Sequence, residues 1–221
     1  MDRKKITLSL LIQQGILPLY FHPDADVSIH ILKALYNAGL RLVEYRNGGE
    51  NAIDNFLQLR KVADEELPGL QLGAGRIINK IQATEFINEG ADFIVCPGVK
   101  EEVAQLADKN NLLWIPGCLT ATEMMLADDL GAQLIKLFPA RLLGPSYLTV
   151  MKEIFPHLLF MPSGDVETTE EDLNSWFTSG ASAIGLGSKL ISKTVVETKN
   201  YEGIETLSRQ TLQIVQKIKS R

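Results

Sequence analysis

The sequence has few cysteines and histidines and no excess of positive charge. Its two cysteines, Cys96 and Cys118, are too few for a disulfide framework and suit a reducing compartment, so a cytoplasmic protein is expected. A formal net charge of −5 provides no basic field for nucleic acid or for an anionic membrane surface. No uncharged apolar run approaches the roughly 18 residues that a membrane-spanning helix needs.

Metal ligands are equally sparse. His22, His30 and His157 are scattered along the 221 residues and the cysteines form no C-x-x-C pair, so no metal site is predicted. Each cysteine is better explained as a small packing residue, because free cysteine is among the most buried residue types. What remains is an ordinary globular composition, 45% hydrophobic and 22% charged, in a chain long enough to bury a full core.

Eight short apolar runs recur along the chain and predict buried parallel strands. Their starts are 19 to 30 residues apart, so each interval holds a helix of about eleven residues and two short loops. The runs are 16–21, 40–45, 70–74, 93–96, 112–115, 134–138, 158–161 and 183–186.

Turn and cap residues support the same repeat. Thr120 with Glu123, and Thr168 with Glu171, have the spacing of a capping box, and Pro145 suits the first position of a helix. Four helices are expected to end at a glycine just before the next strand. These glycines are Gly39, Gly90, Gly131 and Gly180.

Eight strand–helix units predict an α/β fold, a single-domain (β/α)₈ TIM barrel over residues 1–221, with a doubly wound open sheet as the main alternative. We also expect an amphipathic N-terminal helix at about 3–14, in place of a signal peptide, and a C-terminal helix at about 202–219. Barrel enzymes place their active sites at the carboxyl ends of the strands, so candidate residues are sought there.

Lys136 is the most unusual residue of the sequence. It interrupts the apolar run at 134–138, where a strand buried on both faces should be apolar throughout. Burial disfavours the ammonium form and leaves a neutral amine able to attack a carbonyl carbon and form a Schiff base. The alternative is a structural lysine paired with a carboxylate inside the barrel.

Glu44 lies in the second apolar run. Strand alternation places Leu40, Leu42, Glu44 and Arg46 on one face, which we expect to point into the barrel. A carboxylate there can move protons between an imine, its enamine and a substrate hydroxyl through one water molecule. A structural ion pair with Arg46 or Lys136 is the alternative.

The turns after the last two runs are rich in small residues. Ser163, Gly164, Gly187 and Ser188 stand where barrels often build phosphate sites from backbone N–H groups, and they are candidate phosphate ligands. The glycines could instead serve only to permit tight turns. Asp165 would repel a phosphate if its side chain faces the pocket.

Three of these segments carry a family resemblance. With Lys136 in Lys-Leu-Phe-Pro-Ala, Glu44 in Val-Glu-Tyr, and Gly-Ala-Gly at 73–75, the chain resembles the 2-keto-3-deoxy-6-phosphogluconate and 4-hydroxy-2-oxoglutarate aldolases over about 15–190. The resemblance implies a homotrimeric barrel of carbohydrate metabolism that cleaves a 2-keto-4-hydroxy acid to pyruvate and an aldehyde without a metal or cofactor.

By position, the resemblance also implies roles for individual residues. Lys136 would be the Schiff-base lysine and Glu44 the general acid/base. Pro116 and Phe138 would help to wall the pyruvate pocket.

The chain departs from the family pattern at three places that concern substrate binding. Gly48 replaces an arginine that helps to hold the substrate carboxylate, and Arg76 replaces a threonine that also contacts it. Asp165 replaces a glycine of the phosphate loop, which puts phosphate recognition in doubt. We therefore expect Arg46 or Arg76 to supply the carboxylate contact from a new position.

These observations predict a class I aldolase, a carbon–carbon lyase with a small-molecule 2-keto acid as its substrate. One alternative is another barrel enzyme, a sugar-phosphate isomerase or epimerase, in which Lys136 has only an electrostatic role. The other is a decayed aldolase that binds pyruvate without turnover.

Overall fold

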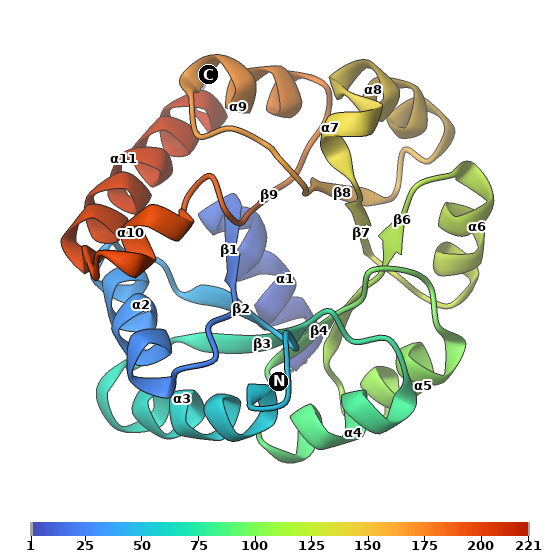
Figure 1. Cartoon of the computed structure of the whole chain (residues 1–221). Coiled ribbons are helices and arrows are strands. Elements are labelled where there is room, and N and C mark those ends of the chain that lie inside the picture. The colour runs from blue at the N-terminus through green and yellow to red at the C-terminus, as the bar shows by residue number, and fades with distance from the viewer. Residues whose placement is uncertain (1, 221) are drawn as a thin grey trace.

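The computed structural model describes residues 2–220, which form an α/β fold with curved parallel sheets at its centre and helices around them (Figure 1). Each of the eight predicted apolar runs overlaps a strand, and one further strand of two residues follows the fifth. The strands are β1 (Ile16–Tyr20), β2 (Leu42–Arg46), β3 (Gln71–Gly75), β4 (Phe93–Val95), β5 (Leu113–Ile115), β6 (Gly117–Cys118), β7 (Leu134–Leu137), β8 (Leu159–Pro162) and β9 (Ile184–Leu186).

All of the strand pairs described between residues 2 and 220 are parallel. Six strands form one curled sheet in the order β5-β4-β3-β2-β1-β9, and three form a second sheet in the order β6-β7-β8. This order lacks the mid-sheet reversal of a doubly wound fold. The predicted α/β class is therefore confirmed.

Two links connect the sheets. An isolated parallel bridge joins Ser163, just after β8, to Gly185 of β9. On the other side, β5 and β6 are one stretch of chain divided at Pro116, whose ring nitrogen carries no hydrogen to donate to a ladder. The Pro116 carbonyl accepts a hydrogen bond of 2.9 Å from the backbone N–H of Lys136.

From α2 onward the helices surround the sheets, whereas α1 precedes β1 (Figure 1). The helices are α1 (Arg3–Gln14), α2 (Ala25–Asn37), α3 (Ala52–Glu66), α4 (Lys80–Asn88), α5 (Glu101–Lys109), α6 (Ala121–Asp129), α7 (Ala140–Leu143), α8 (Pro145–Ile154), α9 (Glu170–Thr178), α10 (Lys193–Glu197) and α11 (Tyr201–Lys219). None of the helices within residues 2–220 is long and apolar enough to cross a membrane.

Most of the predicted helix boundaries are confirmed. The four glycines expected at helix ends all have φ between +83° and +104°, a conformation that side chains with a Cβ rarely adopt. Thr120 and Glu123 form the predicted capping box, and Pro145 opens α8. The cap predicted at Thr168 is wrong by one residue, because the Thr169 hydroxyl accepts the hydrogen bond from the Asp172 N–H.

The core has two parts. A large cluster lies between the strands and the outer helices, and a smaller one fills the space enclosed by the strands. Leu42 and Leu134 belong to the inner cluster, as does Leu11 of α1, which lies behind the strands at the centre of the view in Figure 1. Leu40 was expected on the face of Leu42 but packs in the outer cluster, because it precedes β2.

Candidate active site

The carboxyl ends of the strands surround a cavity of about 620 Å³. Nine of the ten residues predicted for the site line it, and they come from five strands or the loops that follow them. These nine are Glu44, Arg46, Arg76, Lys136, Phe138, Ser163, Gly164, Gly187 and Ser188.

Pro116 is the predicted residue that the structure leaves outside this lining. Its side chain is buried in the break between β5 and β6, and only its carbonyl oxygen serves the site, through the backbone of Lys136. Pro97 after β4 lines the cavity instead. The Cys-Pro-Gly turn at 96–98 marks the end of a strand in the sequence and was a usable signal for it.

Further lining residues were not predicted as site residues. Their apolar or ordinary loop character gives no chemical signal in the sequence, so only their position in space identifies them. Besides Pro97 and Asp165, they are Leu19, Ile78, Pro139, Val166 and Lys189.

Glu44 and Lys136 meet in the interior. Each lies two residues after an inner-cluster leucine, Leu42 on β2 and Leu134 on β7, so strand alternation directs both side chains inward. Glu44 is fully buried and Lys136 is 7% exposed, and Lys136 Nζ lies 3.8 Å from Glu44 Oε2. The Phe138 ring centroid is 5.4 Å from the same nitrogen.

Neither carboxylate oxygen of Glu44 has a hydrogen-bond partner among residues 2–220. A buried carboxylate without hydrogen bonds is costly, so the fold holds an acceptor in the cavity at the expense of stability. An acceptor left without a partner at the wall of a cavity is a candidate for contact with a bound substrate.

The glycines at 73 and 75 make room for this arrangement. A Cβ atom at Gly75 would lie 1.9 Å from Glu44 Oε1, and one at Gly73 would lie 2.2 Å from the Phe93 ring. Both distances are far below van der Waals contact. The Gly-Ala-Gly segment therefore leaves space beside β2 for the buried carboxylate.

The guanidinium groups of Arg46 and Arg76 have no acceptor among residues 2–220. Seven arginines lie within residues 2–220, and the other five each bind an acceptor of the protein. Both unpaired side chains are exposed and line the cavity. They offer the planar donor geometry that suits a carboxylate or phosphate.

The loop after β8 is crossed by a network of charges. Asp165 lines the cavity with a left-handed backbone, φ +56°, that is unusual for a residue other than glycine. Arg141 Nε donates to the Asp165 carbonyl at 3.1 Å, and Lys189 Nζ lies 2.7 Å from Glu167. The hydrogen bond and charge of Glu167, aided by Asp165, raise the pKa of Lys189.

Cys96 and Cys118 are both free and buried, as expected for packing residues. The Trp114 indole N–H donates to Cys96 Sγ at 3.3 Å. Burial raises the pKa of Cys96 to about 11 and that of Cys118 to about 12, so both thiols are protonated near neutral pH. Within residues 2–220, no group of three or more His, Cys, Asp and Glu side chains is placed to hold a metal ion.

The chain is similar to known aldolases along most of its length. The sequence pattern of the KDPG and KHG aldolases (2-keto-3-deoxy-6-phosphogluconate and 4-hydroxy-2-oxoglutarate aldolases) matches residues 9–207. A 2-dehydro-3-deoxy-phosphogluconate aldolase of Pseudomonas aeruginosa is 32% identical over 217 residues, which cover 96% of this chain and 95% of that protein. A KHG/KDPG aldolase of Escherichia coli is 28% identical over 206 residues, 93% of this chain and 94% of that one.

A solved structure gives the same result in three dimensions. A 4-hydroxy-2-oxoglutarate/2-dehydro-3-deoxyphosphogluconate aldolase superimposes with a TM-score of 0.81 at 30% identity, covering 97% of this chain and 99% of the other.

Proposed function

This chain belongs to the KDPG and KHG aldolase family, and from that premise we propose that Lys136 is its Schiff-base lysine and Glu44 its general acid/base. The protein is a class I aldolase, a lyase that releases pyruvate from a 2-keto-4-hydroxy acid of the KDPG or KHG type. The observation that carries the residue assignment is the buried pair of Lys136 Nζ and Glu44 Oε2, 3.8 Å apart at the wall of the 620 Å³ cavity.

The reaction begins when the neutral Lys136 amine attacks C2 of the substrate. The carbinolamine loses water and leaves a protonated imine. The position of Lys136 supports this role, because its Nζ lies at the wall of the cavity and 5.4 Å from the centroid of the Phe138 ring, which would cover bound pyruvate. The reaction as written uses no metal ion or cofactor, because the imine itself accepts electrons.

Glu44 moves the proton through one water molecule. As the C3–C4 bond breaks, its electron pair passes to the imine and forms an enamine, and the C4 hydroxyl gives its proton to Glu44 and becomes the aldehyde. Glu44 then returns the proton to C3, and hydrolysis of the imine releases pyruvate and free Lys136. The unbonded oxygens of Glu44 support this proposal, since they are available to accept a proton.

Arg46 or Arg76 is proposed to replace the arginine that the family uses for the substrate carboxylate. Both are unpaired and line the cavity, whereas position 48 holds glycine. A bidentate guanidinium contact supplies the same charge and geometry from the neighbouring positions.

We propose a phosphate site at the backbone of Ser163, Gly164, Gly187 and Ser188. The carboxylate of Asp165 weakens phosphate binding there. The acidic side chain at the same rim disfavours a second anion. Non-phosphorylated 2-keto-4-hydroxy acids are therefore expected substrates as well.

We further propose that the two sheets close into one eight-stranded barrel forming a single domain, and that the protein is a cytoplasmic homotrimer. The Ser163 to Gly185 bridge and the continuous chain from β5 to β6 support closure. Ile81 of α4 and Met125 of α6 are 72% and 58% exposed, apolar area that a second copy would cover. Light scattering should give the mass of three chains.

Borohydride trapping with pyruvate tests the residue assignment. Peptide mass spectrometry should find a reduced pyruvyl adduct on Lys136, and the Lys136→Ala variant should carry none. A folded wild-type protein without an adduct at saturating pyruvate contradicts the Schiff-base mechanism and favours the isomerase alternative. An adduct that forms without turnover of any aldehyde would favour the decayed aldolase.

A further inference from the structure

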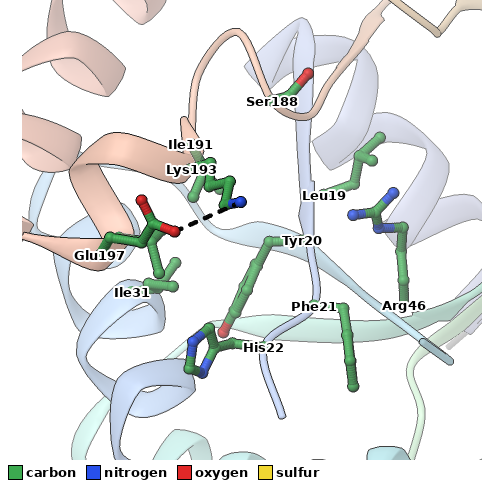
Figure 2. Close-up of a pocket in the computed structure, with 11 residues that line it drawn as sticks. Leu19, Tyr20, Phe21, His22, Ile31, Arg46, Ser188, Ile191, Lys193 and Glu197 are labelled. Atoms are coloured by element: carbon green, nitrogen blue, oxygen red, sulfur yellow. Dashed lines mark ion pairs between the residues drawn. The ribbon is translucent and has the colours of Figure 1, made fainter. Parts of the chain in front are cut away.

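A second cavity of about 320 Å³ adjoins the active site and has no role in the scheme above. It lies between the carboxyl end of β1, the loop after β9 and the short helix α10, and it shares Leu19, Arg46 and Ser188 with the larger cavity (Figure 2). We call it the side pocket. A molecule bound at Lys136 can therefore extend into it past these three residues.

The floor of the side pocket is apolar. Tyr20, Ile31 and Ile191 line it and are almost completely buried. The Tyr20 hydroxyl already donates to the Ser28 carbonyl at 2.7 Å, so this phenol presents its ring rather than its oxygen. Such a floor suits the carbon chain of a ligand and not its charge.

The rim of the side pocket carries two weakly paired or unpaired positive charges. Arg46 has no acceptor among residues 2–220, and Lys193 is paired only with Glu197, at 3.6 Å with both side chains largely exposed. An exposed pair of this kind contributes little and is easily exchanged for a ligand. In Figure 2 the polar ends of Arg46 and Lys193 lie on opposite sides of Tyr20.

The loop after β8 offers the opposite environment. Two cations beside this loop, Arg141 of α7 and Lys189 after β9, are already bound to Glu167, and Asp165 adds another negative charge at the cavity wall. An anion there must compete with carboxylates of the protein, whereas one at Arg46 meets a free guanidinium.

Resting on the proposed aldolase function, whose KDPG and KHG substrates end in a phosphate or a carboxylate, we propose that the side pocket binds this distal anionic end of the aldehyde half in place of the turns after β8 and β9. Arg46 is the specificity-determining residue for that group, and Arg76, which lines only the larger cavity, holds the keto-acid carboxylate. Arg46 follows Glu44 by two residues on the same strand face, roughly 6–7 Å further along β2. The C4 hydroxyl at Glu44 and a terminal group two or three carbons beyond it match that spacing.

The test measures aldol addition of pyruvate to three aldehydes that each have three carbon atoms. They are neutral glyceraldehyde, glyceraldehyde 3-phosphate and tartronate semialdehyde. For the wild-type protein, kcat/KM should favour one of the two anionic aldehydes, and which one identifies the terminal group. The Arg46→Gln variant should lower the ratio of anionic to neutral kcat/KM about tenfold to a hundredfold, as expected for a lost charge-assisted hydrogen bond, and Arg46→Lys should restore part of it.

Two matched variants separate the side pocket from the other candidate site. Val196→Trp fills the side pocket from α10 and should also abolish the preference for the anionic aldehyde, without lowering the yield of the pyruvate adduct on Lys136. Asp165→Gly should change the preference less than twofold. An unchanged ratio in Arg46→Gln, or a preference controlled by Asp165, overturns the side-pocket assignment while the adduct still supports the aldolase mechanism. A missing adduct in the wild-type protein instead overturns that mechanism and the assignment that rests on it.

Discussion

Lys136 Nζ lies 3.8 Å from Glu44 Oε2, beyond hydrogen-bond distance, although both side chains are buried. Charge-assisted hydrogen bonds are strongest near about 2.8 Å, so at the observed distance each group can still bond to a substrate. The pair is held slightly apart, and the Glu44 oxygens accept nothing from residues 2–220. The proposed catalytic role of Glu44 requires such oxygens, because they can accept a proton from a bound substrate.

The first prediction tests the proposed role of Glu44 in proton transfer. Glu44→Gln keeps the shape of the side chain but cannot take the C4 proton, so kcat for aldol cleavage should fall by about 10²- to 10⁴-fold. The pyruvate adduct on Lys136 should still form under borohydride. A variant that loses the adduct as completely as Lys136→Ala would show that Glu44 is needed for imine formation itself.

The second prediction concerns the space beside Glu44. In Gly75→Ala the new methyl group would lie 1.9 Å from Glu44 Oε1, so the carboxylate must move and kcat should fall at least about tenfold. Gly98→Ala is the matched control, because no heavy atom lies within 4 Å of the position its Cβ would take. Steady-state kinetics of the two variants compare the effects. Equal activities would mean that the carboxylate position is not critical.

Much of this site was predictable because polar residues in apolar strands are rare. Lys136 stood out by residue type alone, and strand alternation was enough to turn Glu44 toward the same interior. The repeat of apolar runs located all eight predicted strands, since a buried parallel strand has to be apolar on both faces.

The remaining features depend on packing that no local pattern encodes. The side chain of Pro116 lies outside the cavity that Pro97 lines, a difference set by where the chain breaks between β5 and β6. The capping position shifted from Thr168 to Thr169 because adjacent threonines offer equivalent hydroxyls. That Arg46 has no acceptor among residues 2–220 is visible only in three dimensions, because an acceptor distant in the sequence could have reached its guanidinium group.

The third prediction tests the hydrogen bonds that the Gln14 side chain makes at the opposite end of the strands. The buried side chain of Gln14 donates to the carbonyls of Ile16 and Leu42 at 2.6 and 3.2 Å. It also accepts from the N–H groups of Arg41 and Leu42 at 2.6 and 3.1 Å. Gln14→Ala leaves these groups unpaired and should lower the free energy of unfolding by about 2–3 kcal/mol.

Urea unfolding measures this effect, with Gln13→Ala as the control. Gln13 is the neighbouring residue of the same type but is exposed, so its replacement should change the free energy of unfolding by less than about 0.5 kcal/mol. A similar small change in both variants would show that the start of β2 is held by packing of α1 alone.

The last prediction concerns pH. Burial raises the pKa of Cys96 to about 11 and of Cys118 to about 12, whereas an unfolded thiol titrates near about 8.5. The folded state therefore keeps protons that the unfolded state releases. The resulting contribution to stability is complete below about pH 8.5 and is lost as the pH rises toward the folded values.

The free energy of unfolding should accordingly decline between about pH 8.5 and 9.5, a window below the titration of tyrosine. In a Cys96→Ala/Cys118→Ala variant the decline should be shallower, even though the smaller side chains lower stability at every pH. Urea unfolding at several pH values gives both slopes. Parallel slopes would mean that the thiols titrate alike in the folded and unfolded states, and that burial does not protect them.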